Sequence, residues 1–111
     1  MNCSPGSVVL VRIMFSDGLG SKARPAVVLS SHPYHSARQD AVIVALISQL
    51  DRMYFGDCEI RDWKIAGLKR PSIAKGFIST IKRTTISHQL GVLGEEDYNR
   101  VKDSVRSILA L

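Results

Sequence analysis

The chain has 111 residues, 45% of them hydrophobic, and carries 15 Lys and Arg against 10 Asp and Glu, a formal net charge of +5. This size and composition are typical of one globular domain with its own core, so we treat residues 1–111 as a single domain. The positive charge favours a polyanionic partner, nucleic acid above all. The longest apolar run, Ala41–Ile47, is too short to cross a membrane, which excludes a transmembrane helix.

The first half of the chain alternates apolar strands with polar loops. Val8–Phe15 (VVLVRIMF) is rich in β-branched residues and predicts a first strand, not a signal peptide. Ser16–Ala23, with two glycines, predicts a loop, and Pro25–Ser30 (PAVVLS) predicts a strand that begins on a proline. Ser31–Asp40 is polar and contains a proline, which predicts another loop. Ala41–Ser48 (AVIVALIS) is the most apolar segment and predicts a central strand.

The segment after the central strand has weaker patterns. Asp57–Ile60 predicts a short strand, and Asp62–Ala66 predicts one helical turn that ends before Gly67. Ser72–Ile78 and Thr80–Ile86 alternate weakly between apolar and polar residues, and they predict two further extended segments.

The C-terminal segment Glu95–Leu111 has the spacing of an amphipathic helix. Its apolar residues recur at helical intervals, at Tyr98, Val101, Val105, Ile108 and Leu109. Three acids follow Gly94, and Lys102 and Arg106 come later, which suits the helix dipole. Several short strands closed by one helix predict a mainly β fold with a C-terminal α-helix, in the form of a small barrel.

The two cysteines, Cys3 and Cys58, do not form a CxxC pair, and no group of Cys and His has the spacing of a metal site. We therefore expect two reduced thiols in a cytoplasmic protein that binds neither a metal nor a cofactor.

Arg24 stands directly before Pro25, at the mouth of the second strand and after the glycine-containing loop. A residue before proline is pushed toward extended geometry, which places the Arg24 side chain at the strand entrance. Its planar guanidinium has the donor geometry that suits a phosphate. The alternative is a surface arginine that pairs with Asp17 or Asp40.

Ser48 ends the most apolar strand. Because side chains alternate along a strand, Ser48 is expected to share a face with Val44 and Leu46, where its hydroxyl could face a cleft. The commoner alternative is a hydroxyl that closes the strand by bonding to local backbone.

Histidines and aromatic residues are further candidates. His32 or His35, both in a polar loop, could act as a general base near neutral pH, although loop histidines of this kind are more often solvated. Aromatic side chains that could stack on bases are Tyr34, Phe55, Trp63 and Phe77. For Phe55 and Trp63, a place in the core is the favoured alternative.

The stretch PGSVVLVRIMFSDGLGSKARPAVVLSS resembles the opening of the PemK/MazF family of toxin ribonucleases. AVIVALIS resembles the central strand of the family, and GLKRPSIAKGFISTIKRTTISHQLGVLGEEDYNRVKDSV resembles its later strands and C-terminal helix. The most specific element is Lys-x-Arg-Pro after a glycine, followed by three apolar residues and Leu. The resemblance covers nearly the whole chain in order.

This resemblance implies a small SH3-like β-barrel of the PemK/MazF/CcdB kind, usually a homodimer and cytoplasmic. It implies a metal-independent endoribonuclease, an mRNA interferase, which cuts single-stranded RNA, often at a short sequence. Such a toxin inhibits growth and is silenced by a paired antitoxin protein, as one half of a type II toxin–antitoxin system.

The resemblance also implies roles for individual residues. The catalytic arginine of the family falls on Arg24, and its catalytic Thr or Ser falls on Ser48. The residues expected to contact RNA are Gly20, Lys22, Pro25, Arg52 and Phe77. The loops Ser16–Ala23 and Gln49–Gly56, the second with Arg52 and Tyr54, are expected to form the walls of the RNA groove, although Arg52 could equally be a solvated turn residue.

The expected reaction is attack of a ribose 2′-hydroxyl on the adjacent phosphate, which expels the 5′-oxygen. Arg24, with help from Lys22, would stabilise the negative charge of the transition state. Ser48 would donate a hydrogen bond to the same oxygens or orient the nucleophile. Neither residue is a good general base, so the base stays open between His35, a phosphate oxygen and water.

Some positions depart from the family pattern. Ser7 replaces a common Asp, and Ser48 replaces the commoner Thr but keeps the hydroxyl. Phe77 and Ser79 stand where many members have Gln and a basic residue, which bears on substrate contacts and sequence preference.

Two other functions are compatible with the sequence. One is a related barrel that poisons DNA gyrase by binding, although such relatives lack the Lys-x-Arg-Pro element. The other is an inactive barrel that binds RNA without cutting it.

Overall fold

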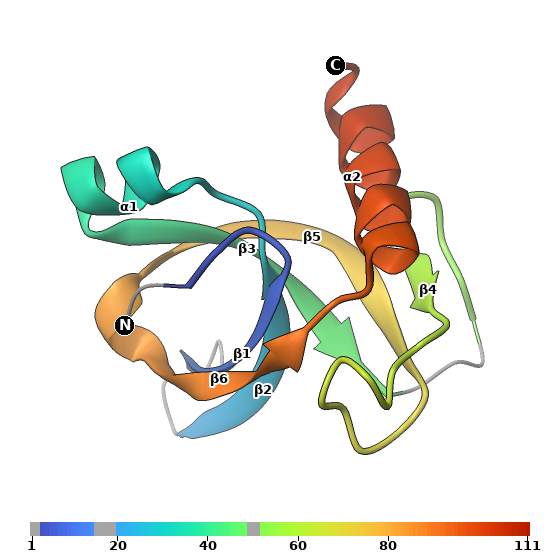
Figure 1. Cartoon of the computed structure of the whole chain (residues 1–111), viewed down its shortest axis with the longest axis horizontal. Coiled ribbons are helices and arrows are strands. Elements are labelled where there is room, and N and C mark those ends of the chain that lie inside the picture. The colour runs from blue at the N-terminus through green and yellow to red at the C-terminus, as the bar shows by residue number, and fades with distance from the viewer. Residues whose placement is uncertain (1–2, 15–19, 49–51) are drawn as a thin grey trace.

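The computed structural model describes residues 3–14, 20–48 and 52–111, and its centre is one curled antiparallel sheet (Figure 1). The sheet has six strands in the order β4-β5-β3-β2-β1-β6. The strands are β1 (Ser7–Met14), β2 (Ser21–Val28), β3 (Asp40–Ile47), β4 (Cys58–Ile60), β5 (Ser72–Lys82) and β6 (Ile86–Val92). The described helices are α1 (His32–Arg38), the 3-10 turn η1 (Arg83–Thr85) and α2 (Glu95–Leu109). The predicted mainly β fold with a C-terminal helix is confirmed, as a half-barrel.

The centre of the sheet is buried on both faces. One apolar cluster contains Val8 and Val27 and packs against α2 through Val101. The other contains the next residues along the same two strands, Val9 and Val28. Because alternate side chains enter opposite clusters, the strands are continuous apolar runs in the sequence.

The segment that was predicted as a polar loop contains the helix α1. Ser31 caps its first turn by accepting the Tyr34 N–H at 3.4 Å, and Pro33 lies in that turn. Gln39 ends the helix in the left-handed conformation, with φ 61°, and its N–H bonds to the His35 carbonyl at 2.9 Å. The prediction was wrong because a proline in the first helical turn does not break a helix; its missing N–H would have no partner there.

Ser72–Ile78 is extended, as predicted, but the expected break before Thr80 and the expected extended segment from there to Ile86 are wrong. The structure has one continuous strand, β5, followed by η1 and by β6, which was not predicted. Ser79, which stands between the two predicted segments, is an exposed residue inside β5. β6 was missed because its first half, after Ile86, exposes polar side chains.

A single helical turn precedes Gly67, as predicted. The Ala66 N–H bonds to the Asp62 carbonyl at 3.3 Å, and Gly67 has a φ of 83°. A Cβ at Gly67 would lie 2.2 Å from the Leu90 carbonyl oxygen, so this turn packs against β6 at a distance that only glycine allows.

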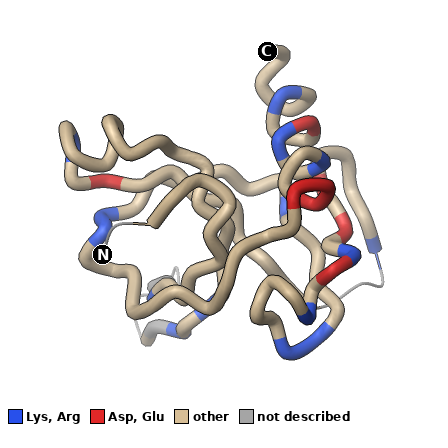
Figure 2. Tube along the Cα trace, in the orientation of Figure 1, with Lys and Arg blue, Asp and Glu red and all other residues tan. Residues whose placement is uncertain are grey.

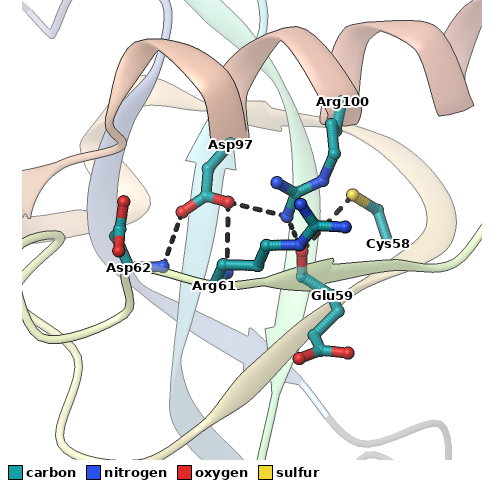
Figure 3. A network of polar contacts seen from close by, with 6 residues as sticks. All are labelled: Cys58, Glu59, Arg61, Asp62, Asp97 and Arg100. Carbon is teal, nitrogen blue, oxygen red and sulfur yellow. Dashed lines mark hydrogen bonds and ion pairs between the residues drawn. The ribbon is translucent and has the colours of Figure 1, made fainter.

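The first turn of α2 is tied to the end of β4 by a buried carboxylate (Figure 3). Asp97 accepts the backbone N–H of Arg61 at 3.1 Å and that of Asp62 at 2.9 Å. It also accepts Arg100 Nη2 at 2.7 Å, and Arg100 donates to the Glu59 carbonyl. The acids at the start of α2 were expected to complement the helix dipole, and Asp97 in addition fixes α2 to β4.

The charges are unevenly distributed over the fold (Figure 2). The first turn of α2 is acidic, whereas the charged residues of the loop between β4 and β5 are mostly basic, namely Arg61, Lys64, Lys69 and Arg70. Within the described part of the chain, no helix is long and apolar enough to span a membrane. The same residues contain no group of three or more potential metal ligands. Cys3 and Cys58 are buried free thiols.

Candidate functional site

An open hollow of about 410 Å³ brings the two predicted catalytic residues together. It is lined by Arg24, Ala45, Ile47, Ser48, Lys75 and Phe77. These side chains come from β2, from β3 and the residue after it, and from β5. A smaller hollow of about 160 Å³, between Leu29 and α2, contains none of the predicted site residues.

Arg24 reaches the hollow because half of β2 is paired on one side only. Pairing with β1 extends along the strand, and Arg24 lies opposite Val11. Pairing with β3 covers only Ala26 to Val28. Pro25, which has no N–H to donate, therefore stands at an unpaired edge, where proline is tolerated. Arg24 is half-buried beside this opening, and none of the described residues forms an ion pair with it.

The alternative for Arg24 was a surface ion pair with Asp17 or Asp40, and the described residues do not contain such a pair. Asp40 pairs instead with Arg38, at 3.5 Å. Asp17 lies outside the described residues.

Ser48 follows the last residue of β3 and is exposed. It lines the hollow together with Ala45 and Ile47, whereas Val44 and Leu46 are buried in the core. The expected common face with Val44 and Leu46 is therefore wrong, because the regular alternation ends with the strand at Ile47. The Ser48 hydroxyl has no hydrogen bond to any described residue, which leaves it available to a ligand.

A bulge in β5 turns two side chains into the hollow. Val44 pairs with Ile78 and Leu46 pairs with Ala74, so the three residues Lys75–Phe77 lie opposite Ala45. Bulges of this kind re-aim side chains and are frequent beside functional sites. Here Lys75 and Phe77 line the hollow, and Phe77 is 69% exposed.

Asp57 holds the bulge in place. Its Oδ1 accepts the Gly76 N–H at 2.8 Å, and its Oδ2 accepts Lys75 Nζ at 2.7 Å and the Tyr54 N–H at 2.9 Å. Burial raises the pKa of Asp57, but the hydrogen bonds from Lys75, Tyr54 and Gly76 and the charge of Lys75 outweigh it, and the net pKa lies below the ordinary 3.8.

An exposed aromatic and basic segment lies next to the bulge. The Tyr54 ring is 5.1 Å from Lys75 Nζ and 4.9 Å from Arg52 Cζ, distances typical of cation–π contacts. Arg52 thus lies near the hollow, through Tyr54. Phe55 is 82% exposed, so the expectation that it belongs to the core is wrong. Trp63 does pack against the core, as expected.

The other predicted RNA contacts lie on or before β2. Gly20 directly precedes β2, and Pro25 is half-buried within it. Lys22 is exposed, and because it is two residues from Arg24 its side chain emerges on the same face of the strand. Residues 16–19 and 49–51 of the two predicted walls lie outside the described residues.

His35 is not part of this site. It is 1% exposed, lies on α1, and its Nε2 is 2.6 Å from Ser30 Oγ. Burial lowers the pKa of His35 below 6.5, and the nearby charges of His32 and Arg83 lower it further. A buried imidazole away from the hollow is excluded as the base for chemistry at Arg24, and the prediction that it is solvated is wrong.

The hollow combines three kinds of group. Arg24 and Lys75 supply positive charge, Ser48 supplies a hydroxyl, and Phe77 supplies an exposed ring. No carboxylate or imidazole is among the lining residues that the structure describes. This set suits a phosphate that is attached to a flat ring, as in a nucleotide chain.

Comparison with known protein families assigns the chain to one family. The sequence model of the PemK-like, MazF-like toxins of type II toxin–antitoxin systems matches residues 4–109. The chain belongs to this toxin family. No curated protein matches the sequence.

Solved structures with the MazF fold superpose on nearly the whole chain. A chain of the MazE–MazF complex from Deinococcus radiodurans has a TM-score of 0.81 at 17% identity, over 100% of this chain and 99% of that one. An endoribonuclease from a mycobacterial species has a TM-score of 0.77 at 15% identity, over 100% and 94%. A mycobacterial endoribonuclease in complex with its cognate antitoxin has a TM-score of 0.74 at 18% identity, over 98% and 96%. At these identities the likeness shows a MazF-type fold.

Sequence reasoning missed the places of Lys75 and Asp57 at this hollow. One signal was present: an isolated glycine inside a predicted strand, Gly76, is typical of a bulge. The contacts of Asp57 cross from one loop to another strand, and no local pattern predicts them.

Proposed function

We propose that the protein is an endoribonuclease toxin of a type II toxin–antitoxin pair that cleaves single-stranded mRNA, with a sequence preference, without a metal ion. The observation that carries this proposal is that Arg24 and Ser48 meet in one hollow of a chain that belongs to the PemK/MazF-like family. Similar folds include two structures of mycobacterial endoribonucleases, one of them with its cognate antitoxin.

The chemistry that fits the hollow is an internal transfer at phosphorus. The ribose 2′-oxygen attacks the adjacent phosphate, the bond from phosphorus to the 5′-oxygen breaks, and the products are a 2′,3′-cyclic phosphate and a 5′-hydroxyl end. The proton of the 2′-hydroxyl passes to water or to a phosphate oxygen, and the 5′-oxygen takes a proton from solvent.

Arg24 stabilises the negative charge that gathers on the phosphoryl oxygens. A guanidinium at the site favours the transition state over the ground state, because the negative charge on these oxygens increases as the reaction proceeds. Ser48 donates a hydrogen bond to the same oxygens or orients the attacking hydroxyl. Pro25 keeps Arg24 extended at the unpaired edge of β2.

Single-stranded RNA is held by charge and by stacking. Phe77 and Tyr54 offer exposed rings for the bases, and Lys22 and Arg52 offer charge for the backbone. The formal net charge of +5 adds long-range attraction for a polyanion.

The protein partner in this proposal is a cognate antitoxin, and the toxin is a cytoplasmic homodimer. Similar structures include MazE–MazF complexes and an endoribonuclease with its antitoxin. An acidic antitoxin segment over the hollow would complement its positive charge and block RNA. A size-exclusion profile of the purified toxin, with and without the product of the adjacent reading frame, tests both assemblies.

The decisive experiment is cleavage of a long single-stranded RNA in the presence of EDTA. We expect wild-type protein to cut it and to leave 2′,3′-cyclic phosphate ends, and we expect Arg24→Ala to cut at a rate at least about 10²-fold lower. Cleavage by the Arg24→Ala protein at the wild-type rate, with a native circular dichroism spectrum, would refute the role of Arg24. Cleavage that requires added metal would refute metal independence.

One observation favours an RNA-binding protein without cleavage as the second candidate. The hollow offers no side chain that is suited to act as a general base among its described lining residues. Binding of RNA with no cleavage over a wide range of RNA sequences would select this alternative. A gyrase supercoiling assay, in which we expect no inhibition, checks the gyrase-poisoning function.

A further inference from the structure

The Asp57–Lys75 pair presents its positive end to the hollow. The Asp57 side chain is 2% exposed and that of Lys75 is 17% exposed, and only Lys75 lines the hollow. The carboxylate therefore lies behind the ammonium group. It can hold Lys75 without itself facing a ligand.

Lys75 is held on two sides and still has donors to offer. Its Nζ is 2.7 Å from Asp57 Oδ2 and 5.1 Å from the centre of the Tyr54 ring. An ammonium group has three N–H donors, and Asp57 takes one of them, which leaves two for oxygens of a ligand. A flexible lysine that is already fixed loses less conformational entropy when it binds.

Asp57 also fixes the backbone that carries Lys75. Its Oδ1 accepts the N–H of Gly76, the middle residue of the bulge. Lys75 and Phe77 flank this residue and both line the hollow. One buried carboxylate thus sets the position of a cation and of an aromatic ring.

We propose that Lys75 is a second phosphate-binding cation of the hollow, opposite Arg24, and that Asp57 is its positioning residue. Arg24 approaches from β2 and Lys75 from β5, with the end of β3 between them. The ligand class is the phosphodiester backbone of a single strand, since two cations beside an exposed ring suit a phosphate linked to a base. This inference rests on the proposed function, which names RNA as the substrate.

The test uses full-length Lys75→Met, with Lys82→Met as the matched control. Lys82 is an exposed lysine at the far end of the same strand, outside the hollow. The probe is a fluorescent 2′-O-methyl RNA, which carries phosphates but no attacking hydroxyl. We expect Lys75→Met to bind more weakly and to lower the slope of log affinity against log salt by about 0.7, the value for one phosphate contact on a single strand. Lys82→Met should leave both quantities unchanged.

Asp57→Asn tests the positioning role. Asparagine keeps a carbonyl oxygen for the Gly76 N–H but loses the charge that holds Lys75. We expect it to weaken binding in the wild-type background and to have no further effect in the Lys75→Met background. The double variant Asp57→Asn/Lys75→Met removes both charges of the pair. It therefore avoids the unpaired buried carboxylate that Lys75→Met alone leaves.

The outcomes separate this inference from the proposed function. If Lys75→Met matches Lys82→Met in affinity and salt slope, Lys75 is not a phosphate contact, even if the wild type cleaves RNA. If the wild type binds the probe but never cleaves RNA, the nuclease is refuted, and the salt slopes still decide the role of Lys75. An additive loss in the double variant would refute positioning by Asp57, and no binding by the wild type would refute both proposals.

Discussion

Pro25 determines where Arg24 can act. Proline removes one backbone donor from β2, and the strand is paired only with β1 from Ser21 to Pro25. The same proline restricts Arg24 to an extended backbone. Arg24 is half-buried at this position and has no carboxylate partner within the described residues.

Replacement of Arg24 by lysine separates charge from shape. Arg24→Lys keeps one positive charge but loses the planar fork that can bind two phosphate oxygens. We expect it to recover only part of the activity that Arg24→Ala loses, and the free energy of unfolding to change by less than about 1 kcal/mol in both variants. Single-turnover cleavage and urea unfolding measure the two effects. Full activity in Arg24→Lys would show that charge alone suffices.

Ser48 is tested by removing and then restoring its hydroxyl. Ser48→Ala loses one hydrogen bond to the transition state, which is worth about 1.4 kcal/mol or tenfold in rate. Ser48→Thr keeps the hydroxyl and should stay near the wild-type rate in the same cleavage assay. Equal rates for the alanine and threonine variants would mean that the hydroxyl takes no part.

Arg24 and Ser48 could be predicted from the sequence because each is marked by its neighbours along the chain. Arg24 precedes a proline, and Ser48 ends an apolar run. Lys75 and Asp57 could not be predicted in this way. Their contact depends on a bulge and on a loop that is 18 residues distant in sequence.

At the scale of elements, α2 contains one ion pair with a buried carboxylate and one at the surface. Asp97 and Asp103 each pair with an arginine three residues later, at 2.7 Å and 3.0 Å. The Asp97 side chain is 2% exposed and also accepts two backbone N–H groups of the segment after β4, whereas the Asp103 side chain is 72% exposed. A comparison of the two pairs therefore shows what burial of the carboxylate adds to the free energy of unfolding.

We expect Asp97→Ala to destabilise the protein by about 3 kcal/mol, because it leaves Arg100 and two N–H groups without their acceptor. Asp103→Ala should change the free energy of unfolding by less than about 0.5 kcal/mol, since exposed pairs contribute little. Urea unfolding of the two variants measures both values. Similar losses would show that burial of Asp97 adds nothing.

The elements were predictable where one physical signal dominates. The first three strands and α2 follow from apolar runs and from helical spacing, and the structure has them within a few residues of the predicted bounds. α1 was missed because the proline in its first turn suggested a loop, and β6 was missed because its tertiary contacts outweigh its polar composition. α1 buries His35 against Ser30, and β6 has mostly polar residues but is held by its pairing with β1.

At the scale of the whole molecule, stability should fall on acidification in two stages. His35 has a folded pKa below 6.5, so the unfolded chain binds its proton first, and stability falls as the pH drops from about 6.5 through the folded pKa. Asp57 has a folded pKa below 3.8, so its contribution is present above that value and is lost as the pH drops through the folded pKa.

Urea unfolding between about pH 7.5 and pH 3 measures both stages. We expect Asp57→Asn to lose less stability than the wild type in the more acidic stage. An NMR titration of the His35 ring should give a midpoint below 6.5. A midpoint at or above that value would contradict the burial of a neutral imidazole.

The β5 bulge sets a rule for the length of this strand. Between the pairs Val44–Ile78 and Leu46–Ala74, β5 advances four residues while β3 advances two. β5 thus has two extra residues, an even number. Ile73 and Ala74 therefore point to the same faces of the sheet as they would in a strand without a bulge. Deleting one residue here would move every side chain from Ser72 to the deletion to the opposite face of the sheet, and the core residues Ile73 and Ala74 would point outward. Natural length variation at this point should therefore come in steps of two.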